Sequence, residues 1–183
     1  MLRKMAATQN ARELLNRVIA RLHPSPGEEA AADTLFATVK ERLRLGDFGD
    51  LQLEPSNFVA TGSYMRNTSI SPLNDVDMFL VFKSKGGQLP DAKKVLLLLH
   101  KVVQQKFQGC SCRLQRRSVN LVLPLDEQKL SFDVVPAFFE SSSGVYKIPN
   151  YSRDTESASW ITSSPSDAVA NLQSAREVRF PLE

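Results

Sequence analysis

The sequence contains 183 residues, of which 42% are hydrophobic and 23% are charged, and its formal net charge is +3. This composition is ordinary for a soluble globular protein, and the small positive charge does not by itself indicate a nucleic-acid-binding protein. No apolar stretch approaches the roughly 18 residues that cross a membrane, and the N-terminus lacks the apolar core of a secretion signal. We therefore predict a cytoplasmic protein with no membrane association.

Two amphipathic helices are predicted near the N-terminus. The first spans residues 8–22, where apolar residues recur at helical spacing. Ser25 and Glu28 have the spacing of a capping box, with a proline between them at the first helical position, which predicts the start of a second helix. This second helix should continue to about Leu45, and Gly46 is expected to end it in a left-handed conformation.

The remaining sequence contains one clear helix among several strand-like runs. Asp91 is placed to cap a helix that continues to about Phe107. Strand-like patterns and flanking turn residues predict strands before Gly62 and over 75–82, 111–116, 118–123, 129–138 and 145–148. Residues 150–164 are rich in Ser and Thr, and residues 165–178 could form a final helix.

These elements predict a single domain, residues 1–183, of the α+β class (α/β-like), with a mixed central β-sheet flanked by helices. Residues 1–46 would form the N-terminal helices, 56–148 the sheet that carries the functional site, and 149–183 the start of a C-terminal helical region. Because apolar residues continue almost to the last residue, we expect that the chain is truncated before a further domain.

The two cysteines, Cys110 and Cys112, are separated by one residue in a predicted strand. Residues at this spacing share a face of the strand but lie too far apart for an undistorted disulfide, and the sequence has no other cysteine. We predict that both are reduced thiols, as is usual in the cytosol.

The stretch from Gly62 to Phe82 is the most informative part of the sequence. It opens with a Gly-Ser turn that follows an apolar run, and it ends with Asp75 and Asp77 at the head of a second apolar run. In a strand these two carboxylates share one face, with Cα atoms about 6.5 Å apart. Two like charges at this distance repel each other, which favours a cation between them unless solvent or protonation reduces the repulsion.

A third carboxylate fits the same pattern. In the predicted strand 129–138, Asp133 shares a face with Ser131 and Val135, whereas the apolar residues between them point the other way. Carboxylate oxygens are the ligands that Mg²⁺ prefers in proteins. Taken alone, each carboxylate could instead be a solvated surface charge or a buried acceptor of backbone hydrogen bonds.

Together these residues resemble the DNA polymerase β nucleotidyltransferase superfamily, whose signature is a GS turn, a DxD pair and a third acidic residue on a later strand. Gly62-Ser63, Asp75-Val76-Asp77 and Asp133 match this signature. The likeness is greatest to the branch that contains cyclic GMP-AMP synthase, bacterial cyclic-dinucleotide synthases and oligoadenylate synthetase, which similarly have a GSxxRxT form and a strand reading like FDVVP. It covers the sequence from about residue 57 to residue 165.

The resemblance implies a nucleotidyltransferase fold and transfer of a nucleoside monophosphate from a nucleoside triphosphate to a hydroxyl group. Gly62 would let the triphosphate approach the backbone closely, and Ser63 would donate a hydrogen bond to it. Asp75, Asp77 and Asp133 would be catalytic and would hold two Mg²⁺ ions, for which Mn²⁺ could substitute. Such chemistry needs in-line positioning and charge neutralisation more than covalent catalysis.

Three further residues are candidates for nucleotide binding. Arg66 belongs to the GSxxRxT pattern, and Tyr146 and Trp160 could stack on a nucleobase. Two of them have a simpler alternative, because Arg66 could be a solvated loop charge and Trp160 a core anchor.

A basic patch is predicted near the sheet edge, where a solvated face is favoured over a nucleic-acid groove; it comprises Arg113, Arg116, Arg117 and Lys129.

We therefore expect a metal-dependent nucleotidyltransferase whose partners are nucleoside triphosphates and a nucleotide or oligonucleotide acceptor, with a cyclic or linear oligonucleotide as product. A nucleic-acid activator is not indicated. The alternatives are a nucleotide-binding regulatory module, an inactive core fragment of such an enzyme, or a transferase that acts on RNA, a protein or an antibiotic.

Overall fold

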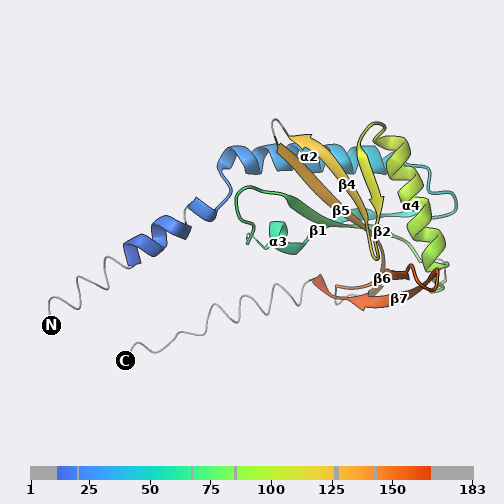
Figure 1. Ribbon diagram of the computed structural model, residues 1–183. Helices are drawn as coiled ribbons and strands as arrows, with labels where there is room; N and C mark the ends of the chain where they lie inside the picture. The colour runs from blue at the N-terminus through green and yellow to red at the C-terminus, as the bar shows by residue number, and fades with distance from the viewer. Residues whose placement is uncertain are drawn as a thin grey trace, which may run out of the picture.

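The structure of the protein is a computed structural model, and it describes residues 12–19, 21–66, 68–84, 86–125, 128–141 and 144–165 (Figure 1). Residues 12–19 are helical, as the sequence predicts, but the first residues of that predicted helix lie outside the described part. The predicted final helix over residues 165–178 also lies outside it, apart from Pro165.

The described elements form a mixed sheet with helices, which confirms the predicted α+β class. The helices are α2 (Pro26–Arg44), α3 (Gly62–Met65) and α4 (Ala92–Lys106). The strands are β1 (Leu53–Thr61), β2 (Asp75–Phe82), β3 (Ser111–Leu114), β4 (Val119–Leu125), β5 (Gln128–Ser141), β6 (Val145–Ser152) and β7 (Ser157–Ser163).

The strand order is β1-β2-β5-β4-β3, and β6 and β7 extend the sheet beyond β5. β2 and β5 are parallel, whereas the other neighbouring strands are antiparallel. β5 is long enough to pair with β4 near its start and with β6 near its end, both on the edge away from β2. β5 therefore connects the two parts of the sheet.

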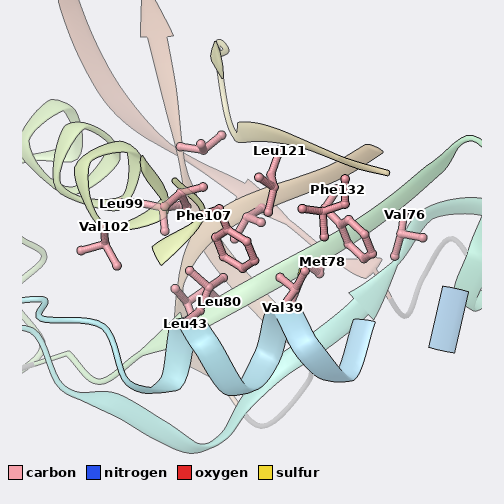
Figure 2. Packing of buried hydrophobic residues seen from close by; sticks show 14 of the residues in the cluster. Val39, Leu43, Val76, Met78, Leu80, Leu99, Val102, Phe107, Leu121 and Phe132 are labelled. Atoms are coloured by element: carbon pink, nitrogen blue, oxygen red, sulfur yellow. The ribbon is translucent and has the colours of Figure 1, made fainter. Parts of the chain in front are cut away.

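The main hydrophobic core lies between one face of the sheet and the two long helices, α2 and α4. Figure 2 shows Val39 of α2 and Leu99 of α4 packing with strand residues such as Met78 and Phe132. All four side chains are fully buried. Because alternate residues of a strand point to opposite faces, this packing leaves the odd-numbered residues of β2 and β5 on the face away from the helices.

The second face carries a smaller apolar cluster. It consists of Phe79, Val81, Val135, Ala137 and Ile148, contributed by β2, β5 and β6. β2 is therefore buried on both faces after its first residues, which agrees with the uninterrupted apolar run in its sequence.

The start of α2 forms as predicted, but its end does not. The Ser25 hydroxyl accepts a hydrogen bond from the Glu28 backbone, and the Glu28 carboxylate accepts one from the Ser25 backbone, which completes the capping box. Gly46 does not take the left-handed conformation that the sequence predicts. A β-carbon at this position would instead lie 2.6 Å from Val102 and 2.9 Å from the Leu43 carbonyl oxygen, so the glycine is required by close packing.

The sheet also continues further than the sequence predicts. Residues 149–163, expected to begin a helical region, form the end of β6 and the whole of β7. The pairing of these strands is regular from Tyr146 with Ser163 to Ser152 with Ser157. The Ser- and Thr-rich composition of β7 hides its strand character, because few of its residues are strongly apolar.

Cys110 and Cys112 are free and half-buried, and burial raises the pKa of the Cys112 thiol to about 11. Within the ranges that the structure describes, no helix combines the length and the apolar character needed to cross a membrane.

Replacing Gly46 with alanine should destabilise the protein by about 1–3 kcal/mol, because the new methyl group would overlap with packed atoms. The matched control is Gly27→Ala in the first turn of α2, where a β-carbon would meet only the Ser25 hydroxyl, at 3.9 Å. Urea unfolding of both variants measures the difference. An unchanged midpoint for Gly46→Ala would contradict the packing explanation.

Candidate active site

The three predicted carboxylates come together on the face of the sheet away from the helices. Asp77 of β2 lies directly opposite Asp133 of β5 in the parallel pairing, and Asp75 lies opposite Ser131. Neighbouring strands are separated by about 4.8 Å, so the Asp77 and Asp133 side chains project from adjacent points of one face. The two strands thus bring together acidic residues that are 56 positions apart in sequence.

Asp77 is the electrostatic centre of this group. Burial raises the pKa of its carboxyl group, and the negative charges of Asp133 and Asp75 raise this pKa further. The positive charge of Arg66 acts in the opposite direction but does not cancel these effects. The ionised form of Asp77 is therefore destabilised, and a cation bound beside it would relieve this cost.

The predicted Gly-Ser turn lies against Asp77. Thr61, the last residue of β1, pairs with Asp77, and Gly62 follows with φ of +68°. A β-carbon on Gly62 would overlap with the Asp77 carboxylate. Glycine is needed here for two independent reasons, the positive φ angle and the close approach. The turn itself is the first residue pair of the short helix α3.

Ser63 is held by contacts within its own loop. Its hydroxyl accepts a hydrogen bond from the Ser69 hydroxyl at 3.3 Å, and its carbonyl oxygen accepts one from the Thr68 backbone at 3.0 Å. The Ser63 side chain is half-buried. The loop between α3 and β2 thus folds back on the turn and orients the serine.

Arg66 contributes positive charge to the site. Its Nε atom is buried and has no hydrogen-bond partner among the described residues. A buried donor without a partner is costly in a folded protein and often marks a position where a ligand or water binds. The guanidinium also lies close enough to Asp77 to affect its pKa.

Asn120 belongs to the site although sequence analysis did not identify it. It pairs with Asp133 across β4 and β5, and its amide nitrogen donates hydrogen bonds to the Asp133 carboxylate at 2.7 Å and the Ser131 hydroxyl at 2.6 Å. The amide therefore fixes the orientation of Asp133. The available signal was a single polar residue between the apolar residues Val119 and Leu121, but the sequence does not reveal which residue it pairs with.

The two aromatic candidates lie on opposite faces. The Tyr146 ring packs edge-on against the Phe79 ring, with 5.3 Å between the ring centroids. Tyr146 therefore lies on the carboxylate face, further along the strands. Trp160 packs against Phe138 on the helix face, and its indole nitrogen donates a hydrogen bond to the Pro90 carbonyl oxygen. The structure thus does not bring Trp160 to the carboxylates, and its contacts are those of a core anchor.

A cavity of about 480 Å³ adjoins α3 on the side of α2. Its lining includes Ser69 but none of the three carboxylates. The Tyr64 hydroxyl donates a hydrogen bond to the Asp33 carboxylate beside this cavity, and burial, with this bond, raises the pKa of Tyr64. This contact fixes α3, and with it the Gly-Ser turn, to α2.

The chemistry of the carboxylates fits a hard divalent cation. Three acidic side chains supply oxygen ligands, and their mutual repulsion favours a positive charge between them. Among the residues described here, however, no group of three acidic, His or Cys side chains already has the geometry of a metal site. Any ion would thus have to be completed by ligands from elsewhere, such as water or phosphate oxygens.

The architecture matches solved structures of one kind of enzyme. These include CdnC from E. coli MS115-1 in a complex with HORMA-deltaN (TM-score 0.60, 16% identity), a CdnE cyclic dinucleotide synthase from Elizabethkingia meningoseptica with GTP and Apcpp (0.57, 19%), and the CD-NTase CdnG from Bradyrhizobium diazoefficiens with GTP (0.62, 13%). The matches cover 90%, 78% and 82% of this chain. At these identities they show that the protein has the nucleotidyltransferase fold.

The sequence identifies the family within this fold. Residues 8–175 match the Second Messenger Oligonucleotide or Dinucleotide Synthetase domain, and the chain belongs to this family. The membership confirms the predicted branch of the superfamily. A search of curated protein sequences found no match. The chain spans 50%, 51% and 43% of the lengths of the three structures, or about half.

Replacing Asp77 with asparagine should stabilise the protein at neutral pH. The pKa of Asp77 is raised in the folded state, so the folded protein binds this proton more readily than the unfolded chain does. Stability is therefore lost as pH rises from the ordinary aspartate pKa through the raised value, and the asparagine variant avoids this loss. Its melting temperature should exceed that of wild type at pH 7, and the difference should shrink towards pH 4.

Thermal unfolding of both proteins without divalent ions measures this effect. Asp154→Asn, at an exposed position between β6 and β7, is the control and should show no such difference. A destabilised Asp77→Asn variant at pH 7 would indicate that the carboxylate is held by favourable contacts and that the charges around it do not repel.

Proposed function

We propose that this chain is the catalytic core of a metal-dependent nucleotidyltransferase that moves a nucleoside monophosphate from a nucleoside triphosphate to a hydroxyl of a nucleotide acceptor. The product would be a cyclic or linear oligonucleotide signal. One observation carries the proposal: Asp77 and Asp133 lie opposite each other on neighbouring strands, with the backbone of Gly62 directly against Asp77. Membership of the synthetase family supports the same conclusion.

The donor triphosphate would bind beside Gly62. The missing side chain leaves room for phosphate oxygens near the backbone, and the half-buried Ser63 hydroxyl could donate a hydrogen bond to them. The unpartnered Nε of Arg66 supplies a donor and a positive charge on the same side. Two of the similar structures contain GTP, and one of them also Apcpp, which agrees with nucleoside triphosphates as substrates.

Asp75, Asp77 and Asp133 would hold Mg²⁺, and we expect two ions, with Mn²⁺ able to replace them. When bound, such ions neutralise charge on the triphosphate and lower the pKa of a hydroxyl nucleophile. The protein's own contribution is to hold the three carboxylates on a rigid sheet and to keep Asp133 oriented through Asn120. Asp133 in its ionised form could also accept the proton of the acceptor hydroxyl.

A second candidate function is a nucleotide-binding module or an inactive core. It is favoured by one observation, that the chain covers only about half the length of the similar enzymes. Such a module would bind nucleoside triphosphates with divalent metal but would release no product.

Activity can be tested with ATP and GTP radiolabelled at the α-phosphate, in the presence of Mg²⁺ or Mn²⁺. Wild type should form labelled oligonucleotides, whereas Asp77→Asn and Asp133→Asn should lose activity by about a hundredfold or more, since each removes a charge on which the site depends. Asp154→Asn is the matched control and should keep wild-type activity. Full activity in Asp77→Asn would exclude the assigned role, and metal-dependent binding without product would favour the second candidate.

Asn120 provides a test of the site that does not need turnover. Asn120→Ala removes the hydrogen bond that orients Asp133, so the Mn²⁺ concentration that stabilises the protein against heating should rise about tenfold. Asn120→Ser, which keeps a short hydroxyl donor, should give a smaller change. Equal metal responses of wild type and both variants would contradict a metal at Asp133.

A further inference from the structure

A surface hollow lies where the turn between β3 and β4 meets the end of β6. Its volume is about 520 Å³, and it is lined by Gln115, Arg116, Tyr151, Ser152, Arg153 and Asp154. Sites for small molecules commonly have volumes of about 300–1,000 Å³, so the hollow is large enough for such a ligand. None of its lining residues belongs to the candidate active site.

The two walls of the hollow are tied to each other by hydrogen bonds. The Tyr151 backbone N–H donates to the Arg116 carbonyl oxygen at 2.8 Å. The Arg153 guanidinium donates to the Leu114 carbonyl oxygen at 2.9 Å. These contacts hold the two arginines on neighbouring segments, so a ligand that binds between them need not order the backbone first.

The charges that line the hollow are mainly positive. Arg116 and Arg153 are its two cationic residues, and Asp154 is its one acidic residue. Within the described ranges, neither arginine forms an ion pair, even with Asp154. A guanidinium carries five N–H donors, and Arg153 uses one nitrogen for Leu114, so both side chains retain donors for a ligand. Planar donors of this kind suit a phosphate group.

Uncharged polar groups complete the lining. The Gln115 side-chain oxygen accepts a hydrogen bond from the Ser118 hydroxyl at 2.8 Å, which orients the amide and leaves its nitrogen as a donor. The hydroxyls of Tyr151 and Ser152 can both donate and accept hydrogen bonds. Such groups match the hydroxyls of a sugar.

We propose that this hollow is a second ligand site, which binds the phosphate group of a small sugar phosphate between Arg116 and Arg153. Free sugar phosphates and nucleoside monophosphates share this chemistry. The inference goes beyond the proposed function, because binding here uses neither the three carboxylates nor a metal ion. The exposed Asp154 carboxylate opposes binding and favours a ligand with a single phosphate group over a polyanion.

The structure also divides the basic patch that the sequence predicts. Arg113 and Lys129 belong to β3 and β5, whereas Arg116 and Arg117 lie in the turn between β3 and β4. Of these four residues, Arg116 is the one that lines the hollow. Arg117 is equally charged and exposed, which makes it a matched control for Arg116.

Both arginines have a simpler role that the test must separate from ligand binding. Arg153 stabilises the β3–β4 turn through Leu114, so its replacement could weaken the fold. Arg116 could be a solvated turn residue, since its guanidinium contacts no polar group among the described residues. Arg116 is therefore the better residue to vary, because its loss should leave the fold intact.

The test is calorimetric titration with ribose 5-phosphate, AMP and inorganic phosphate in the presence of EDTA, which keeps metal-dependent binding at the carboxylates out of the measurement. Wild type should bind one molecule of ribose 5-phosphate or AMP with a dissociation constant below about 1 mM. Inorganic phosphate should bind more weakly, because it lacks the sugar hydroxyls. Arg116→Gln should weaken ribose 5-phosphate binding by about tenfold or more, because a charge-assisted contact is lost.

The matched variants sharpen this test. Arg117→Gln should bind within about twofold of wild type, and Arg116→Lys should fall between wild type and Arg116→Gln, because lysine keeps the charge but not the planar donors. Asp154→Asn should bind at least as tightly as wild type. Circular dichroism and thermal unfolding of each variant show whether a loss of affinity comes from a loss of structure.

Several results would overturn the site. These are no binding of ribose 5-phosphate or AMP to wild type, full affinity in Arg116→Gln, or an equal loss in Arg117→Gln. Tighter binding of a short RNA duplex than of either sugar phosphate would show a nucleic-acid surface instead. None of these results bears on the proposed function, whose own test uses labelled triphosphates with a divalent metal. Conversely, an inactive protein that binds ribose 5-phosphate through Arg116 would keep this site and lose the proposed function.

Discussion

The parallel pairing of β2 with β5 is the constraint on which the site depends. It places Asp77 against Asp133 at the start of two core strands, where neither charge can move away from the other. Burial and the charges of Asp133 and Asp75 destabilise the ionised form of Asp77, and the positive charge of Arg66 opposes this effect. The protein tolerates this unfavourable free energy because the same strands bury a large apolar surface on the opposite face, which stabilises the fold. Packing against α2 and α4 thus holds together a charge arrangement that would otherwise separate.

The two faces of the sheet differ because successive side chains of a strand point to opposite faces. Even-numbered residues of β2 and β5 form the main core. The odd-numbered residues supply the three carboxylates near the start of the strands and a small apolar cluster further along. A one-residue slip of either strand would bury the carboxylates among the helices, so the hydrophobic pattern itself enforces the register of the site. Core and site are therefore specified by the same alternation.

Much of this could be predicted from the sequence, because it depends on local patterns. The capping box at Ser25, the shared face of Asp75 and Asp77, and the buried run that follows them all involve residues a few positions apart. The pairing of residues that lie far apart in the sequence was harder to predict. Asn120 becomes visible as a site residue only once β4 is aligned with β5. The same holds for the need for a glycine at position 46, which depends on a side chain of α4.

The pairing of β1 with β2 limits where residues can be inserted into or deleted from β1. The register is continuous from Phe58 to Thr61 but shifts between Leu53 and Phe58. An added or lost residue in that irregular stretch can be absorbed before the strand reaches Gly62. The same change after Phe58 would turn the glycine to the opposite face of the sheet. Natural variation in length should therefore accumulate before Phe58, whereas the last four residues of β1 keep a fixed register with β2 and so set the position of the Gly-Ser turn.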